Sequence, residues 1–217
     1  EKQYNTHGLV TQSIDYDYGV AMGNWPVASL ILRDTNITYA TNLGGIVDRM
    51  SSVTVTDSHA NVISKTTYSY DENRALTTSG TPEHANITGS RGNVTTINTY
   101  STLSAFLSKH FVYFDTGNVY QATDVNGAVT TFTYAACGNS LPTQVSVPLG
   151  LSTSTGYDAN CAGAVSTSST DENGNITTTT YNDPYFWRPA SVQYPDGGQT
   201  SYFYDSPTQK RTNSKID

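Results

Sequence analysis

The chain has 217 residues, of which 36% are hydrophobic and only 13% are charged, and its formal net charge is −7. Its 11 Lys and Arg residues are scattered and form no basic patch, so we expect no nucleic-acid partner. No apolar run is long enough to span a bilayer, and the first residues do not resemble a signal peptide. Both ends read as cuts through a longer polypeptide, so any signal or anchor is expected outside this segment.

The composition predicts an all-β chain. Thr and Tyr favour strands, whereas Gly, Asn and Asp favour turns, and these residue types replace the usual charged ones. In chain order, we expect strands at residues 27–33, 36–40, 52–56 and 62–70. A turn-rich loop at 78–93 follows, and then the only predicted helical turn, at 102–109.

Repeated sequences dominate the second half. The segment TDVNGAVTTFTY (123–134) matches TDENGNITTTTY (170–181) at eight positions, and looser copies occur at 56–68 and 91–100. Tyr134, Tyr157, Tyr181 and Tyr204 follow one another at intervals of 23, 24 and 23 residues, and Tyr113 precedes them; we call these five the ladder tyrosines.

The repeat predicts a unit of strand, turn and strand. Side chains in 176–181 alternate, with Ile176 on one face and Tyr181 on the other. One such hairpin is too small to be stable alone, but stacked units can form an open repeat β-sheet, a strip or solenoid. The tyrosine rings are then expected to stack on one face. We expect a β-rich segment with degenerate repeats at 1–90 and clear repeats at 91–217; no sharp change in composition separates them, so one continuous domain also fits.

The stretch 170–181 has three interpretations. Asp171, Asn173 and Asn175 alternate like calcium ligands, but a calcium loop starting at Asp171 lacks its Gly and its final Glu. Asn175 also begins a glycosylation sequon, one of several that arise by chance in a chain rich in Asn and Thr. Asn173 and Gly174 favour a type I′ hairpin turn, which is the interpretation we adopt.

The only two cysteines are Cys137 and Cys161. An even number suits a disulfide in an oxidising compartment, and two free buried thiols are the alternative. A bridge would join two neighbouring turns of the repeat array.

These repeats resemble the YD-repeat family, also called rearrangement-hotspot (RHS) repeats, in which Y-D-x-x-G and T-D-x-x-G-N segments recur. The best matches are 123–134, 170–183 and 194–205, and the resemblance is weak over 1–55. It implies a long β-sheet that forms a strip or hollow shell in large secreted or cell-surface proteins, mostly bacterial and distantly similar to teneurins. The self-cleaving Asp-Pro-x-Gly motif of some members is missing, so neither a cleavage site nor a toxin domain is carried over.

The sequence predicts no catalytic residue, metal site or cofactor, and therefore not an enzyme. Its four histidines have no metal-ligand or catalytic spacing. Two of the three carboxylates of Asp183, Glu172 and Asp196 could form a glycosidase pair, but each lies near a turn Gly or Pro, where a solvated carboxylate is ordinary.

An aromatic cluster is the best candidate for binding. Tyr185, Phe186 and Trp187 precede Arg188, and Trp25 is the second tryptophan. We expect the rings to be mostly buried, with Arg188 stacked on a ring or paired with Asp183. The alternative is an exposed platform that binds a glycan or a protein partner.

The function predicted from these features is structural. We expect a scaffold or shell segment of an extracellular bacterial protein, with other repeats of the same polypeptide as its partners. The alternatives are the binding module just described and a self-associating filament subunit that pairs through exposed sheet edges.

Overall fold

A computed structural model gives the fold of the chain. It describes residues 1–18, 28–72, 76–85, 87–183, 186–206 and 208–215. Two compact units are present. The first comprises Glu1–Thr77 and Asn86–Gly127, and the second comprises Thr78–Ala85 and Ala128–Asp217. Trp25 and Tyr185 lie outside the described residues.

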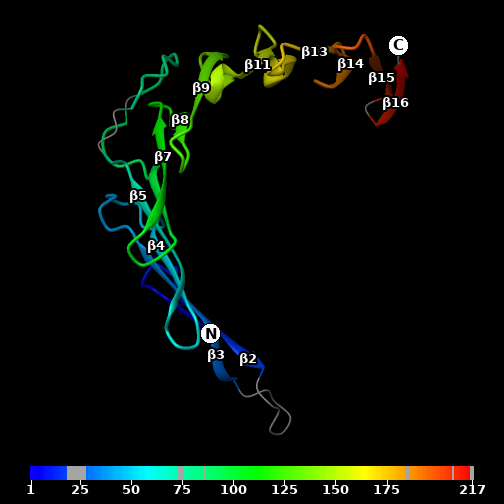
Figure 1. Ribbon diagram of the computed structural model, residues 1–217. Helices are drawn as coiled ribbons and strands as arrows, with labels where there is room; N and C mark the ends of the chain where they lie inside the picture. Colours follow the sequence, from blue (N-terminus) through cyan, green and yellow to red (C-terminus); the bar gives the residue numbers. More distant parts are fainter. Residues whose placement is uncertain (19–27, 73–75, 86, 184–185, 207, 216–217) are drawn as a thin grey trace. The chain divides into compact units, whose positions relative to one another are not determined.

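The fold is all-β, and the strands follow one another in the sheet in chain order. Within each unit every strand pairs antiparallel with its sequence neighbours, and Figure 1 shows these neighbours side by side. The first unit contains β1 (Lys2–Tyr4), β2 (Val10–Tyr18), β3 (Ala28–Tyr39), β4 (Met50–Thr56), β5 (Val62–Tyr70), β6 (Val94–Tyr100), β7 (Phe106–Tyr113) and β8 (Val119–Thr123). The second contains β9 (Val129–Ala136), β10 (Leu141–Ser146), β11 (Ser152–Tyr157), β12 (Ser166–Thr170), β13 (Ile176–Tyr181), β14 (Pro189–Gln193), β15 (Gln199–Ser206) and β16 (Gln209–Lys215).

Two predictions about the first half are wrong. The predicted helical turn at 102–109 is a bend followed by β7, because pairing with β6 and β8 on both sides overrides the helix propensity of its Leu, Ala and Lys residues. The strands predicted at 27–33 and 36–40 are the single strand β3. Asp34 does not interrupt this strand, because it pairs with Ile14 on one side and Thr56 on the other.

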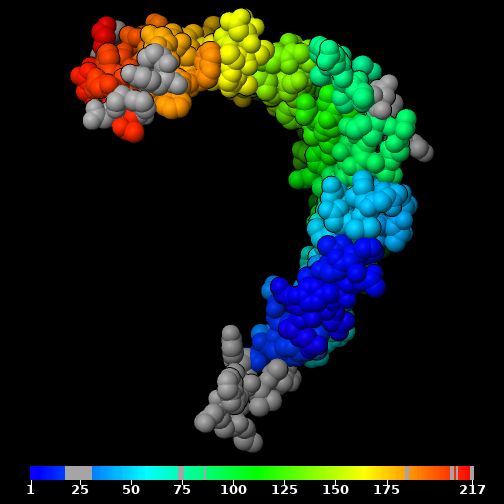
Figure 2. Space-filling model, turned by 180° about the vertical axis from the view of Figure 1, so that it is seen from behind, coloured from blue at the N-terminus to red at the C-terminus, as the bar shows by residue number. Residues whose placement is uncertain are grey.

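The sheet forms a single layer with almost no core. Among the described residues, the only buried hydrophobic side chains are Leu43 and Phe114. The predicted alternation is present in β13, where Ile176 is exposed and Tyr181 is half-buried. In the space-filling view the colours of residues 128–217 follow chain order from green to red, as expected when each strand pairs with its sequence neighbours (Figure 2). Hydrogen bonds between strands and side-chain contacts along the sheet must therefore provide the stability that a packed hydrophobic core gives to most domains.

The turn at 171–175 is built by one carboxylate. Asp171 accepts hydrogen bonds from the backbone N–H groups of Asn173 and Asn175 and from the side-chain amide of Asn175. These bonds, led by the one from the Asn175 side chain, lower the pKa of the Asp171 carboxyl. Of the two residues predicted to form a type I′ turn, only Gly174 has a positive φ, of 83°. The prediction of that turn type is therefore wrong, and the hairpin closes as a longer loop with glycine in the left-handed position.

The same turn recurs between β4 and β5. Asp57 accepts hydrogen bonds from the backbone N–H groups of His59 and Asn61 and from the Asn61 side chain. Ala60 occupies the left-handed position there, with φ 62°. This turn therefore does not require glycine in the left-handed position.

Candidate functional site

Tyrosine hydroxyls connect strands along both units. Six tyrosines donate a hydrogen bond to a backbone carbonyl at or next to the start of the preceding even-numbered strand, with O···O distances between 2.7 and 3.0 Å. The bonds run from Tyr39 to Val10, Tyr70 to Met50, Tyr113 to Val94, Tyr157 to Pro142, Tyr181 to Ser166 and Tyr204 to Pro189. These six residues form the observed ladder, and four of them are among the five ladder tyrosines predicted from the sequence. Each tyrosine side chain thereby reaches from its own strand to the start of the preceding strand.

The acceptor residues make the ladder continuous within each unit. Met50 pairs with Tyr39 in the sheet and accepts the hydroxyl of Tyr70. In the second unit, Ser166 pairs with Tyr157 and accepts the hydroxyl of Tyr181. A register shift accompanies each of these pairings, consistent with a β-bulge. Each step of the ladder thus combines a register shift, a tyrosine and the backbone carbonyl that accepts the tyrosine hydroxyl.

Among the described residues, no two rings of the observed ladder are in contact, so the expected stacking is not found there. Within each unit, successive ladder tyrosines lie on every second strand, and strands are about 4.8 Å apart, so the rings start roughly 9.6 Å apart, beyond contact distance. In the part of the chain that the structure describes, the ring pairs in contact are Tyr100–Phe106 and Phe114–Tyr120. The ladder therefore stabilises the sheet through hydroxyl groups and not through ring stacking.

Burial raises the pKa of two of the donor hydroxyls in the first unit. Desolvation raises the pKa of Tyr113, with a further contribution from the negative charge of Asp71. Burial is also the first cause of the raised pKa of Tyr70.

Removing one ladder hydroxyl should cost about 1 kcal/mol. In a Tyr157→Phe variant the ring remains, but the carbonyl of Pro142 loses its donor. We expect urea denaturation to show a lower free energy of unfolding. Tyr194→Phe is the matched control, since Tyr194 is 41% exposed and lies outside the ladder. Equal effects of the two substitutions would contradict a stabilising ladder.

A disulfide joins two loops of the second unit. Cys137, in the turn between β9 and β10, is bonded to Cys161, in the loop between β11 and β12, with a Cα–Cα distance of 5.5 Å. Both cysteines have positive φ. The loop at Cys161 is ordered further by Asp158, whose carbonyl and carboxylate accept the N–H groups of Cys161 and Ala162.

Trp187 packs against the loop that the disulfide holds. A Cβ atom built on Gly163 would lie 2.8, 2.9 and 3.2 Å from Cγ, Cδ1 and Cδ2 of Trp187. Nearly equal distances to these three atoms place the glycine over the face of the indole ring. Gly163 also has φ 75°, so any side chain there would be strained as well as in collision.

The rings of the aromatic cluster are more exposed than predicted. Phe186 is 58% exposed and Trp187 is 51% exposed, so the expectation that they are mostly buried is wrong. They lie in the β13–β14 loop of a single-layer sheet, where the Trp187 ring contacts Gly163.

The expected pair of Arg188 and Asp183 is present. Arg188 donates from Nε and Nη2 to the two carboxylate oxygens at 2.6 and 3.0 Å. The Asp183 side chain is 0% exposed and that of Arg188 is 22% exposed. Asp183 also accepts the N–H of Phe186, and the guanidinium lies 3.8 Å from the ring centroid of Tyr204. This buried ion pair fixes the loop to a ladder tyrosine.

A polar cluster that the sequence did not indicate surrounds Glu72. Its carboxylate accepts hydrogen bonds from the hydroxyls of Thr95 and Thr96, which are only 4% and 7% exposed. The Thr96 hydroxyl lies 3.1 Å from Nδ1 of His110. Glu72 lines two cavities, of about 350 and 260 Å³. The only sequence signal was the Tyr-Asp pair at 70–71.

Within the described ranges, no group of three or more His, Cys, Asp or Glu side chains is arranged to hold a metal ion. No helix among the described residues is long and apolar enough to cross a membrane.

Together, the single-layer sheet and the ladder define an open repeat β-sheet protein. No protein-family model matches the sequence, and no curated protein shows significant similarity to it. Solved structures with a similar fold do exist. One is a crystal structure of TcdB2-TccC3 without its hypervariable C-terminal region, with a TM-score of 0.51, 15% identity, and coverage of 94% of this chain and 10% of that chain.

Two further structures match more weakly. TcdB2-TccC3-Cdc42 has a TM-score of 0.48 at 13% identity, covering 97% of this chain and 11% of that one. The Tc holotoxin pore of Photorhabdus luminescens has a TM-score of 0.47 at 14% identity, covering 100% of this chain and 11% of that one. This chain thus spans about a tenth of the length of its structural neighbours, and at such identities the likeness is one of fold alone.

Proposed function

We propose that the chain is a structural segment of a large extracellular bacterial YD-repeat (RHS) protein, and that it serves as a scaffold or shell and not as a catalyst. The observation that carries this proposal is the ladder, in which six units use the same tyrosine-to-carbonyl bond. A single binding or catalytic site does not need the same hydrogen bond in every unit, whereas a sheet built from stacked repeats does. The fold shared with a TcdB2-TccC3 structure and the Cys137–Cys161 disulfide support the proposal.

Removing one complete unit tests the scaffold. Ser166 and Pro189 are equivalent, because each pairs with a ladder tyrosine and accepts the hydroxyl of the next one. Deleting residues 166–188 therefore places Pro189 opposite Tyr157. We expect the shortened chain to keep its β-sheet circular dichroism per residue and to unfold cooperatively at a lower urea concentration.

A shorter deletion, of residues 166–175, is the control, because it removes β12 and the turn after it but keeps β13 and both cysteines. It puts the ladder out of phase and should abolish cooperative unfolding. If both deletions unfold the chain equally, the units are not interchangeable and the scaffold proposal fails.

The exposure of Phe186 and Trp187 favours a second candidate function, the binding of a glycan or a protein partner by this aromatic surface. The two functions differ in one observable. Binding requires the Trp187 emission to shift when a glycan is added, whereas a scaffold requires no such shift.

A further inference from the structure

The β5–β6 loop belongs to both units. The chain leaves the first unit after Thr77, and residues 78–85, which we call the strap, are part of the second unit before the chain returns to the first at Asn86. It passes from the first unit to the second again after Gly127. The chain therefore passes between the two units three times while the strap is docked, and once when the strap is released.

The chain on either side of the strap is anchored in the first unit. Before the strap, Thr77 donates its N–H to the carbonyl of Tyr113 at 3.1 Å and accepts the N–H of Asp115 at 3.0 Å. After the strap, the carboxylate of Asp71 accepts the backbone N–H groups of residues 91–93 at 2.7, 2.8 and 3.0 Å.

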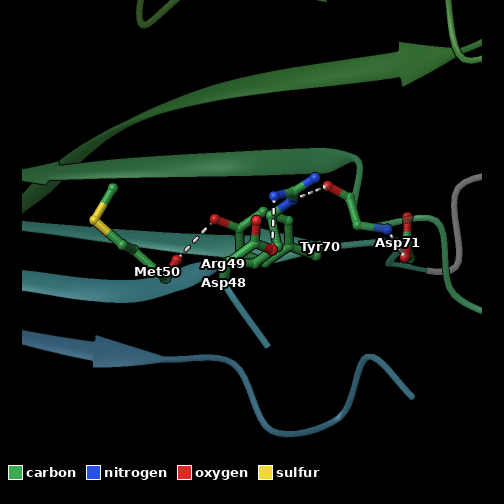
Figure 3. A network of polar contacts seen from close by, with 6 residues as sticks. Asp48, Arg49, Met50, Tyr70 and Asp71 are labelled. Carbon is green, nitrogen blue, oxygen red and sulfur yellow. Dashed lines mark hydrogen bonds and ion pairs between the residues drawn. The ribbon is translucent and has the colours of Figure 1, made fainter. Parts of the chain in front are cut away.

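Arg49 fixes the returning chain as well. Its Nε donates to the carbonyl of Gly92 at 3.2 Å, and its Nη1 is paired with Asp48 at 2.8 Å (Figure 3). A Cβ atom built on Gly92 would lie 3.0 Å from Arg49 Nε and 3.2 Å from Cδ1 of Ile46, so the backbone is closely packed there. We therefore expect any movement of the loop to occur between these anchors and not at them.

Two contacts place the strap on the β9–β10 turn of the second unit. Asn139 donates from Nδ2 to the carbonyl of Gly80 at 3.1 Å, and a Cβ atom built on Gly138 would lie 3.1 Å from Cδ of Pro82. The hydroxyl oxygen of Thr81 is buried and has no hydrogen-bond partner in the described part of the chain, which disfavours the docked strap. An exposed hydrogen bond contributes little, so we expect a small change in the turn to release the strap.

The turn that receives the strap has a strained backbone. Cys137, Gly138 and Asn139 follow one another with φ of 54°, 68° and 60°. Ser140 closes the turn by donating its N–H to the carbonyl of Ala136 at 3.1 Å. For residues with a side chain the left-handed region is strained, and it persists only where the surrounding structure holds it.

The disulfide supplies such a restraint. Connections that are two strands apart in a sheet start roughly 9.6 Å from each other. The Cα atoms of Cys137 and Cys161 are only 5.5 Å apart, so the bond draws the β9–β10 turn toward the β11–β12 loop. When the bond is broken, the turn loses this restraint and is expected to relax, which moves Asn139 away from the carbonyl of Gly80.

We propose that the Cys137–Cys161 disulfide is a redox-sensitive latch for the strap. The oxidised bond holds the left-handed turn on which residues 78–85 dock, and reduction lets the turn relax and the strap leave the second unit. A dithiol reductant breaks the S–S bond and gives two thiols; it supplies two electrons and two protons and itself closes to a cyclic disulfide. The latch does not depend on the proposed scaffold function, because it acts on the strap and not on the ladder.

A Glu-specific endoprotease reports the state of the strap in the full chain. Glu83 is exposed in the strap, and Glu172, exposed in the turn of Asp171, is the internal reference. Reduction should accelerate cleavage after Glu83 about fivefold and leave cleavage after Glu172 unchanged, as measured by mass spectrometry. Unchanged cleavage after Glu83, with both thiols shown by alkylation, would overturn the proposal. Equal acceleration at both sites would mean that the bond holds the whole unit and not the strap, which also overturns it.

A variant tests the docking contact while the disulfide stays intact. Asn139→Gly adopts the left-handed backbone without strain and removes the Nδ2 donor, so it should release the strap under oxidising conditions. Cleavage after Glu83 should be about fivefold faster than in the unsubstituted chain, and a dithiol should add little. Asn160→Gly, in the loop that carries Cys161, is the matched control and should leave this cleavage unchanged. If Asn139→Gly does not accelerate it either, the strap is not held by this contact and the latch is refuted.

Discussion

Replacing Arg188 by methionine is expected to lower the free energy of unfolding of the second unit by about 3–5 kcal/mol. The substitution leaves the Asp183 carboxylate, which is 0% exposed, without its cation. It also removes the guanidinium from the ring of Tyr204. Adding Asp183→Asn should restore part of the loss, because asparagine has no buried charge and still accepts the N–H of Phe186. Urea denaturation followed by tryptophan fluorescence, in a Trp25→Phe background, measures the second unit through Trp187.

The chain contains a matched control for this prediction. Arg211 and Asp205 make the same two-bond contact, at 2.9 and 3.1 Å, and Arg211 also lies over a ring, that of Phe203. Their side chains are 66% and 47% exposed, however, so water screens the pair. Arg211→Met should cost less than about 1 kcal/mol. If the two substitutions cost the same, burial of the Asp183 pair is not what stabilises the loop.

Removing the disulfide is expected to have an effect of similar size. A bridge with a sequence separation of 24 restricts the unfolded chain by about 3.5 kcal/mol in the chain-entropy model. The Cys137→Ser/Cys161→Ser double variant should lose this stability in the second unit, measured in the same way. Because Cys161 lies two residues from Gly163, we also expect the emission of Trp187 to change.

Reduction provides the control for the disulfide. Treating the unsubstituted chain with a dithiol should reproduce the stability of the double variant, and the same treatment of the double variant should change nothing. A loss below about 1 kcal/mol would mean that the contacts around Asp158 hold the loop without the bridge.

The second half was predictable because its units are regular. The near-identical spacing of Tyr134, Tyr157, Tyr181 and Tyr204 indicated the repeat period, and Asn173 and Gly174 indicated the hairpin, although not its turn type. In the first half, Tyr39 and Tyr70 occupy the same structural position, but long loops separate them. A fixed interval therefore does not reveal them, although the ladder bond itself is unchanged.

The site residues show where sequence reasoning stops. The pairing of Arg188 with Asp183 follows from their closeness in sequence, but the exposure of Trp187 depends on there being no second layer above the loop. The Glu72 cluster was not found, because Thr95 and Thr96 come near Glu72 only after the β5–β6 loop has closed. No local pattern encodes such an approach.

The pairing of strands in chain order has a consequence for how the protein is made. Within each unit no strand has to wait for a partner from a distant part of the chain. Each new strand can add to the sheet as soon as it leaves the ribosome, and the loop-closure entropy it must overcome is only that of its own turn. The next tyrosine then bonds a carbonyl that is already in place, as Tyr181 does with Ser166. Synthesis and folding can thus advance together, one hairpin at a time, and a defect in one hairpin need not spread to those already formed.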